Sequence, residues 1–318
     1  MIKLGIVGAT GLVGQTVLKV LKEQGLLDRF ELCLIASKES LSKTIEFNGL
    51  QYKVIELNES CLRLGLDVVI FSAGDDVSDC WCEQFVEQGV FVIDNSNAFR
   101  RRADVPLIVP EINGELVSKK TKLISNPNCS TIQLAMVVDA LRDIVSIDQV
   151  VVSTYQSVSG AGKDALKDYQ LGTRNFFKKG IRDNIVASIG LEDDTGFCSE
   201  ERKIMFELKK ILNCKIDVVA TAVRVPIAFC HGESVYVKTR ECFNLSEIIS
   251  NLKRRGLKVS DDLFYPVDCA GTNDTYVCRI RKCGEWGLAL FIIADNLRRG
   301  AAFNAVKILE KIIPYFTN

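Results

Sequence analysis

The sequence contains almost no histidine and no excess of charge of either sign. His231 is the single histidine in 318 residues, and 40 lysines and arginines balance 40 aspartates and glutamates. One histidine leaves little for a zinc site, and a net charge of zero argues against binding to nucleic acid or to an acidic membrane surface. An uncharged apolar run of roughly 18 residues, the length that spans a membrane, is also missing. We therefore expect no metal, nucleic acid or membrane among the partners.

The cysteines lack the C-x-x-C spacing that is typical of metal and redox sites, although twelve of them are present. The chain opens with an apolar run, residues 2–7, that is typical of a buried strand and not of a secretion signal. Twelve thiols without such a signal indicate a reduced, cytoplasmic protein. If the chemistry needs an imidazole, it must be that of His231.

A glycine-rich turn follows the first apolar run. It reads Gly8-Ala9-Thr10-Gly11-Leu12-Val13-Gly14, and apolar residues at helical spacing come after it. Glycines let the backbone approach a pyrophosphate, and the next helix presents its positive end to that group. Because a strand precedes the turn and a helix follows it, we interpret it as a dinucleotide site and not as an ordinary tight turn.

The end of the second predicted strand, residues 31–36, bears on the choice of cofactor. In dinucleotide-binding folds this end meets the adenosine ribose, where an acidic residue often selects NAD. No aspartate occupies that place. Ser37, Lys38 and Ser40 could hold the 2′-phosphate of NADP, whereas Glu39 would repel it. We expect NADP, and NAD stays open as the alternative.

Two further apolar runs, residues 67–71 and 90–93, continue an alternation of strands and helices. This alternation predicts a doubly wound parallel sheet, a Rossmann-type domain, through about residue 128. Ligands bind at the carboxyl ends of such strands, where Gly8, the segment Ser72-Ala73-Gly74 and Asn95 would gather.

A basic loop follows Asn95 and contains Arg100, Arg101 and Arg102. Charge runs are usually solvated turns. The functional alternative is an oxyanion clamp, because guanidinium groups suit bidentate contacts with phosphate.

Cys129 lies in the polar segment Ser125-Asn126-Pro127-Asn128-Cys129-Ser130-Thr131, just before a continuous apolar helix pattern over residues 132–141. Asn128 or Ser130 could cap this helix, which would place Cys129 in its first turn. Unpaired N–H groups and the helix dipole favour a thiolate there. Cysteine is often a packing residue, but these polar neighbours do not suit that role. We interpret Cys129 as a nucleophile.

The pattern changes after Cys129 to that of an α+β region. Helices are predicted at 200–212 and 245–254, and strands at 150–156, 216–224, 233–239, 275–281 and 288–293. The last stretch, 297–313, is helical in pattern, and we expect it to pack on the first domain. The predicted domains are therefore 1–128 with 297–318, for the dinucleotide, and 129–296, for catalysis and dimerisation.

A thiolate beside a dinucleotide site indicates one class of reaction. Sulfur attacks a carbonyl, hydride passes between the thiohemiacetal carbon and a nicotinamide, and an oxyanion such as phosphate exchanges with the thioester. The protons of the thiol and of the hemiacetal call for a base, and His231 has the natural pKa for it.

Four motifs together resemble those of the aspartate-β-semialdehyde dehydrogenase family. They are the glycine turn at 8–14, Ser-Asn-Pro-Asn-Cys-Ser-Thr at 125–131, Tyr-Gln-Ser-Val-Ser-Gly-Ala-Gly at 155–162, and Val-Arg-Val-Pro at 223–226 with His231 seven residues after the arginine. The resemblance runs over nearly the whole chain. It implies the NADP-dependent reduction of aspartyl phosphate to aspartate semialdehyde, in the biosynthesis of lysine, diaminopimelate, threonine and methionine, by a homodimer or homotetramer.

The resemblance also implies a role for each matching residue. Cys129 is the implied nucleophile, His231 the acid and base, and Gln156 the residue that orients the reacting carbon. The implied substrate ligands are Arg224 for the α-carboxylate, Glu200 for the α-ammonium, and Asn95, Arg100 and Lys203 for the phosphate. The implied cofactor contacts are Gly8 to Gly14, Ser37, Lys38, Ser72, Ala73, Gly74, Ser159, Gly160, Gly162 and Asn296.

Some of these residues have simpler interpretations, and other functions stay open. Glu200 and Lys203 could form an exposed helix pair, and His231 could cap a turn. Glu39 stands where the family usually has arginine. N-acetyl-γ-glutamyl-phosphate reductase and glyceraldehyde-3-phosphate dehydrogenase share the chemistry, but usually place the cysteine in Pro-Gly-Cys or Ser-Cys-Thr-Thr. A catalytically silent, nucleotide-binding scaffold is the alternative outside enzymology.

Overall fold

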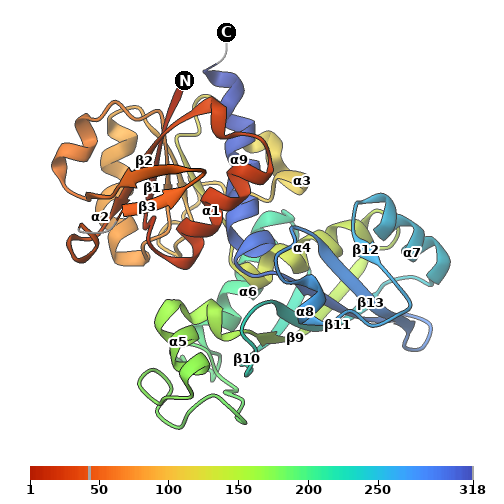
Figure 1. Cartoon of the computed structure of the whole chain (residues 1–318). Coiled ribbons are helices and arrows are strands. Elements are labelled where there is room, and N and C mark those ends of the chain that lie inside the picture. The colour runs from red at the N-terminus through yellow and green to blue at the C-terminus, as the bar shows by residue number, and fades with distance from the viewer. Residues whose placement is uncertain (42–43, 317–318) are drawn as a thin grey trace. The chain divides into compact units, whose positions relative to one another are not determined.

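The computed structural model describes residues 1–41 and 44–316, and these form two compact units. The first unit contains Met1–Pro127 and Ala301–Asn318, and the second contains Asn128–Gly300 (Figure 1). The first domain was predicted to end at residue 128, one residue later than in the structure. The C-terminal segment was predicted to begin at residue 297, four residues earlier than in the structure.

The first unit contains a six-stranded sheet in the order β5-β2-β1-β6-β7-β8, with every neighbouring pair parallel. Its strands are β1 (Ile2–Val7), β2 (Phe30–Ala36), β5 (Ile55–Glu56), β6 (Val68–Phe71), β7 (Phe91–Asp94) and β8 (Leu123–Ser125). The predicted Rossmann-type sheet is confirmed. The strands β1, β6 and β7 are buried almost throughout, which explains why they read as continuous apolar runs.

Helices and one hairpin complete the first unit. They are α1 (Leu12–Glu23), α2 (Asp75–Glu87), α3 (Pro110–Asn113), α9 (Phe303–Ile312) and the hairpin β3 (Thr44–Phe47) and β4 (Leu50–Lys53). Short 3₁₀ turns cover Leu27–Arg29, Lys38–Ser40, Glu59–Arg63, Gly114–Leu116 and Ile313–Tyr315. The sequence pattern did not reveal β3, β4, β5 or β8, because these short strands are not buried throughout and so lack the continuous apolar run of β6 and β7.

The C-terminal helix packs on the first unit, as predicted. Leu309 and Ile312 of α9 belong to the same apolar cluster as Leu4 of β1, and Figure 1 shows α9 beside α1 and α3. The predicted helix over 297–313 differs in its first turn, which is a π-helical turn at Arg298–Ala302. The Asp295 carboxylate accepts the N–H groups of residues 297 and 298, so the helix begins only at Arg298.

The second unit contains a mixed six-stranded sheet in the order β10-β9-β11-β14-β13-β12. Its strands are β9 (Ile147–Gln156), β10 (Asp217–Arg224), β11 (His231–Thr239), β12 (Lys258–Val259), β13 (Thr275–Lys282) and β14 (Gly287–Ala294). Its helices are α4 (Cys129–Arg142), α5 (Lys163–Leu171), α6 (Ser199–Ile211), α7 (Leu245–Arg254) and α8 (Pro266–Cys269), with a 3₁₀ turn at Val158–Ala161. The predicted α+β class is confirmed.

The two faces of this mixed sheet differ. Along β11, Glu233, Val235 and Val237 are buried, whereas Ser234 and Tyr236 between them are exposed. α4 contacts β9, β11 and β14, so helices cover the buried face. On the opposite face, Cys269 of α8 packs with Ile293 of β14, whereas Ser234 and Tyr236 of β11 are exposed.

Candidate functional site

Cys129 is the first residue of α4, and Asn128 is its cap. The Asn128 Oδ1 atom accepts the N–H groups of Ser130, at 2.9 Å, and Thr131, at 3.3 Å. The thiol is partly exposed and lies in the first turn of α4, where the helix dipole favours a thiolate. Gly300 packs directly behind it, because a Cβ atom at residue 300 would lie 2.8 Å from the Cys129 Cβ.

Three of the predicted site residues form one row across neighbouring strands. Gln156 ends β9, and the sheet register pairs it with Arg224 at the end of β10 and with His231 at the start of β11. Paired residues project to the same face of a sheet, and all three side chains are buried. The strand was predicted to start only at residue 233, because Gly232 interrupts the apolar pattern. In the structure β11 begins at His231, so this histidine is a strand residue and does not cap a turn.

Glu200 is the centre of a buried polar cluster. Its Oε1 atom accepts hydrogen bonds from Asn128 Nδ2, at 2.8 Å, and Gln156 Nε2, at 3.1 Å. Its Oε2 atom is 3.3 Å from Lys203 Nζ. Burial opposes ionisation, but the charge of Lys203 and the hydrogen bonds from Asn128 and Gln156 hold the pKa of Glu200 below its ordinary value. Glu200 and Lys203 are therefore not a merely exposed pair.

Arg224 is a buried cation. Its Nη1 atom donates to the Ser157 carbonyl at 2.7 Å and approaches Gln156 Oε1 at 3.5 Å. Among the described residues, no carboxylate lies within 4.0 Å of its guanidinium nitrogens. Burial lowers the pKa of Arg224, and the negative charge of Glu200 counteracts this. A buried guanidinium without a carboxylate partner is suited to binding an anionic ligand.

His231 is fully buried, and its two ring nitrogens differ. The backbone N–H of Ser157 donates to Nδ1 at 3.1 Å, whereas Nε2 has no hydrogen-bond partner among the residues that the structure describes. Burial, together with the positive charge of Arg224, lowers the pKa of His231 to about 3. The imidazole is therefore neutral at neutral pH.

The loop after β9 supports this histidine. Asn296 Oδ1 accepts from Ser157 Oγ at 3.0 Å, Ser159 Oγ at 3.3 Å and the Cys230 N–H at 3.0 Å. Asn296 and Ser159, which were predicted as cofactor contacts, are thus part of the histidine's surroundings. Gly160 lies close by, and Gly162, with φ +97°, precedes α5.

The predicted residues of the first unit also come together. A Cβ atom on Gly8, which has φ +83°, would lie 2.4 Å from the Ser72 carbonyl oxygen, and one on Gly14 would lie 2.4 Å from the Gly8 oxygen. Only glycine permits this close packing at the carboxyl ends of the strands. Asn95 Nδ2 donates to the Phe71 carbonyl at 2.8 Å, and Ala73 and Gly74 are exposed just after β6.

Arg100 and Arg102 of the basic loop differ in burial and in their partners. Arg100 is buried, and its Nε and Nη2 atoms donate to the carbonyls of Asn126, at 2.9 Å, and Asn95, at 2.7 Å. Arg102 forms salt bridges with Glu83 and Asp104 at the surface, as a solvated turn would. Asn95 and Arg100 are therefore neighbours in the first unit, while Lys203 belongs to the second.

Lys38 and Glu39 are exposed in the 3₁₀ turn after β2. Ser40, in the same turn, is within hydrogen-bond distance of Thr10 in the glycine turn, at 3.3 Å between their Oγ atoms. A hydrogen bond from Ser37 lowers the pKa of Glu39, which is therefore negatively charged at neutral pH.

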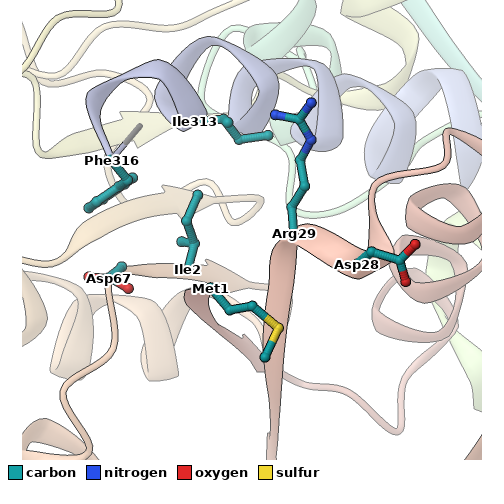
Figure 2. Close-up of a pocket in the computed structure, with 7 residues that line it drawn as sticks. All are labelled: Met1, Ile2, Asp28, Arg29, Asp67, Ile313 and Phe316. Atoms are coloured by element: carbon teal, nitrogen blue, oxygen red, sulfur yellow. The ribbon is translucent and has the colours of Figure 1, made fainter. Parts of the chain in front are cut away.

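A separate cavity of about 490 Å³ lies at the amino-terminal edge of the parallel sheet (Figure 2). It is lined by Met1, Ile2, Asp28, Arg29, Asp67, Ile313 and Phe316. None of the predicted site residues lines this cavity, which is at the opposite edge of the sheet from the glycine turn.

Glu233 is a buried carboxyl that the sequence patterns did not single out. It lies two residues after His231, beside Gln133, whose Nε2 atom donates to the His231 carbonyl at 3.3 Å. Burial raises the pKa of Glu233 well above its ordinary value, and the contact with Gln133 offsets this only in part. A strand pattern places Glu233 on the same face as His231, but only the tertiary structure shows that this face is buried.

Glu233 should make the folded protein less stable as the pH rises. Its folded pKa is raised, so the folded state retains a proton that the unfolded state releases above the ordinary carboxyl range, and stability falls with rising pH. We expect Glu233→Gln to unfold at higher urea than the wild type at about pH 8 and to lose that advantage toward about pH 5, with about 1.4 kcal/mol for each unit of pKa difference. Glu285→Gln, at an exposed position, is the control; an advantage that does not change with pH would contradict the prediction.

Known protein families match both units. Residues 3–120 match the family model described as semialdehyde dehydrogenase, NAD binding domain, and residues 138–299 match semialdehyde dehydrogenase, dimerisation domain. Aspartate-semialdehyde dehydrogenase of Aquifex aeolicus is 40% identical, over 98% of this chain and 98% of the relative. That of Bacillus subtilis is 36% identical, over 96% of each chain.

Solved structures are similar over the same length. The crystal structure of aspartate semialdehyde dehydrogenase II from Vibrio cholerae, complexed with ASA, aligns with a TM-score of 0.93 at 36% identity, over 99% of this chain and 98% of the other. These matches cover both units. The chain belongs to the aspartate-semialdehyde dehydrogenase family.

Proposed function

We propose that the chain reduces L-4-aspartyl phosphate to L-aspartate 4-semialdehyde, reversibly and with NADP, through a thioester on Cys129. The observation that carries this proposal is the set of charged and polar groups in one buried cluster: Arg224, Glu200, Gln156 and His231, together with a thiol at a helix N-terminus. This reaction serves the biosynthesis of the aspartate family of amino acids, including lysine, diaminopimelate, threonine and methionine.

The amino and carboxyl groups of aspartate have complementary partners in this cluster. Arg224 offers guanidinium donors to the α-carboxylate, and the ionised Glu200 attracts the α-ammonium. Gln156 touches both of these residues, through Glu200 Oε1 and Arg224 Nη1. We assign it to orienting the reacting carbon, because it fixes the distance between the two substrate ligands.

Cys129 forms and breaks the covalent bond. Its thiolate attacks the acyl carbon, the carbon–oxygen bond to phosphate breaks, and phosphate leaves with the electron pair. A bound nicotinamide cofactor supplies the hydride that reduces the resulting thioester. The positive charge of Arg224 is close enough to interact with Cys129, and it favours the thiolate. We assign Asn95, Arg100 and Lys203 to the phosphate, as cations and amide donors.

The first unit has the features that a dinucleotide requires. The close contacts of Gly8 and Gly14 leave backbone without side chains at the carboxyl edge of the sheet, and α1 begins there at Leu12. We assign residues 8–14, Ser37, Lys38 and 72–74 to the cofactor. Ser159, Gly160, Gly162 and Asn296 of the second unit are assigned to it as well, with Ser159 and Asn296 also holding the loop beside His231.

The choice between NADP and NAD should depend on two adjacent exposed charges. Glu39→Gln removes a negative charge beside the expected 2′-phosphate, and we expect the KM for NADP to fall about two- to fivefold, the range of a surface charge pair. Lys38→Gln should raise it by a similar factor. The KM for NAD, measured in parallel, should change little. Equal changes for both cofactors would remove these residues from the 2′-phosphate site.

The face of the mixed sheet that carries Ser234 and Tyr236 is the proposed homodimer interface. Tyr155 stacks on Phe291 there, with ring centroids 6.0 Å apart, and Val219 and Tyr236 are more than a third exposed. Aromatic residues of this kind dominate protein interfaces.

A charge on this face should dissociate the dimer. We expect Tyr236→Glu to reduce the mass in sedimentation equilibrium from twice 35.3 kDa toward 35.3 kDa, because a buried carboxylate would replace an aromatic contact. Leu50→Glu, at a residue 58% exposed in β4 of the first unit, is the control. An unchanged mass for Tyr236→Glu would place the interface elsewhere.

The activity is tested by following reduced nicotinamide with L-aspartate semialdehyde and phosphate, against the semialdehyde of N-acetylglutamate. Phosphate-dependent reduction of the cofactor with the first aldehyde is expected. Reduction with the second aldehyde alone would support the reductase of the acetylated substrate. No reduction with either, from protein whose Cys129 still reacts with a thiol reagent, would favour a nucleotide-binding scaffold.

A further inference from the structure

Cys230, the residue before His231, has a backbone conformation that is unusual for its type. Its φ is +70°, in the left-handed region that favours glycine. In the described part of the chain, five residues other than glycine have a positive φ, and Cys230 is the one among them that is buried. A strained backbone persists only where its surroundings fix it, and such residues often lie at functional sites. A buried, strained residue beside His231 is therefore a candidate for a role in catalysis.

The N–H group and the side chain of Cys230 both have fixed partners. The N–H donates to Asn296 Oδ1 at 3.0 Å, and Sγ donates to the Pro266 carbonyl at 3.3 Å. Burial raises the pKa of the Cys230 thiol, so the thiol stays protonated and can donate at neutral pH. The side chain also packs with Cys269 and Ile293 in a small apolar cluster. These contacts together hold the left-handed conformation.

The carbonyl of Cys230 is directed at the ring of His231. Burial and the charge of Arg224 lower the pKa of His231, whereas a hydrogen bond with the Cys230 backbone and the charge of Glu200 raise it. A hydrogen bond that raises the pKa of an imidazole favours its protonated form, so the ring donates and the carbonyl accepts. Cys230 therefore opposes the effect of burial on the neighbouring histidine.

The ring thus has one backbone partner that favours its neutral form and one that favours its protonated form. The Ser157 N–H donates to Nδ1 at 3.1 Å, which requires a lone pair on that nitrogen. The Cys230 carbonyl requires an N–H on the ring. A donor and an acceptor beside the same ring suit an imidazole that takes up and releases a proton during each turnover.

We propose that Cys230 is a positioning residue for His231: its left-handed backbone, held by Asn296 and Pro266, directs its carbonyl at the imidazole and fixes the ring in the orientation that acid–base catalysis requires. This role rests on the proposed function, in which His231 is the acid and base that the family resemblance implies. Because Asn296 holds the N–H, a change of φ to about −120°, a common value in strands, would turn the carbonyl away from the ring. The thiol contributes only by helping to hold this conformation.

Glycine and alanine at position 230 separate this role from packing. Glycine adopts a positive φ without strain, whereas alanine keeps the strain and loses the thiol contacts that offset it. We expect Cys230→Gly to keep kcat within about threefold of the wild type and Cys230→Ala to lower it about tenfold, with little change in the KM for aspartate semialdehyde. Packing alone predicts the reverse order, because glycine leaves the larger cavity. A Cys230→Gly variant that is less active than Cys230→Ala would overturn the proposal.

Cys278 provides the matched control, because its thiol is also buried in the second unit but lies in β13. Cys278→Gly and Cys278→Ala should both keep the kcat of the wild type, and the glycine variant should be the less stable of the two in urea, as is usual in a strand. At position 230 the glycine variant should be the more stable of the two. The same order of stability at both positions would contradict the role of the left-handed backbone.

The single histidine gives a second readout that a loss of packing would not change. In the full-length protein labelled with ¹⁵N-histidine, all imidazole nitrogen signals belong to His231. Cys230→Gly should reproduce the wild-type signals, and Cys230→Val should shift them, because a β-branched residue strongly disfavours a positive φ. Wild-type signals in a folded Cys230→Val variant would overturn the proposal. Lack of turnover by the wild type with either semialdehyde would instead refute the proposed function, and the NMR comparison would still decide whether Cys230 orients the ring.

Discussion

Cys129→Ser is expected to abolish turnover while the fold stays intact. The first turn of α4 can stabilise a thiolate, because cysteine ionises within a few units of neutral pH, but a serine hydroxyl is far too weak an acid to ionise there. Loss of the nucleophile should cost at least about 10⁴-fold in kcat, on the scale seen when other covalent catalysts lose theirs. The measurement is the rate of cofactor reduction with aspartate semialdehyde and phosphate. The fluorescence change on cofactor binding should remain, because the glycine turn belongs to the other unit.

Cys214→Ser is the matched control, because that thiol is also partly buried but lies just after α6. It should retain activity and should still lose that activity on treatment with a thiol reagent. Appreciable turnover by Cys129→Ser, or inactivation of the wild type that follows modification of another cysteine, would remove Cys129 from the mechanism.

Arg224→Leu should produce the second largest loss. The substrate carboxylate would then be buried without a cation, which commonly costs 2–5 kcal/mol, so we expect kcat/KM to fall about 10²–10³-fold. Arg224→Lys should recover only part of this loss, because an ammonium cannot present the two parallel donors of a guanidinium. The effect should appear mainly in KM if Arg224 binds the substrate equally in the ground and transition states.

Arg63→Leu, at an exposed position in the first unit, controls for the general effect of replacing an arginine with leucine. A small substrate analogue without the carboxylate provides a second check. The wild type and Arg224→Leu should turn it over at similar rates, because the lost partner is missing from both reactions. A difference of more than about tenfold on that analogue would mean that Arg224 acts on the reacting carbon.

The sequence revealed the parts of the fold that depend on local patterns. Strands buried on both faces read as apolar runs, so β1, β6 and β7 could be found, and the polar segment before an apolar helix located Cys129. Short strands that are partly exposed carry no such run, so β5, β8 and the β3–β4 hairpin were missed. The helix α5 was not predicted either; it lies between the predicted strand at 150–156 and the predicted helix at 200–212.

The contacts that position the site were beyond the reach of the sequence because they join distant segments. Asn128 was predicted as a possible helix cap. The hydrogen bond from its Nδ2 atom to Glu200 could not be predicted, because it joins residues 72 positions apart. The Ser157 amide that donates to His231 Nδ1 is 74 residues away from it. Tertiary packing also decided that Glu233, on the same strand, is buried beside Gln133. In each case the residue type permitted the contact, but only the tertiary structure brought the partners together.

The row formed by Gln156, Arg224 and His231 restricts how the length of this protein can vary. Side chains alternate between the two faces of a sheet, so deleting a single residue within β9 would turn either Gln156 or the buried residues before it to the opposite face. Loops between the strands can gain or lose residues without this penalty. Length differences among active relatives should therefore fall in the loops, and a change of an odd number of residues inside β9, β10 or β11 should mark a protein that has lost this chemistry.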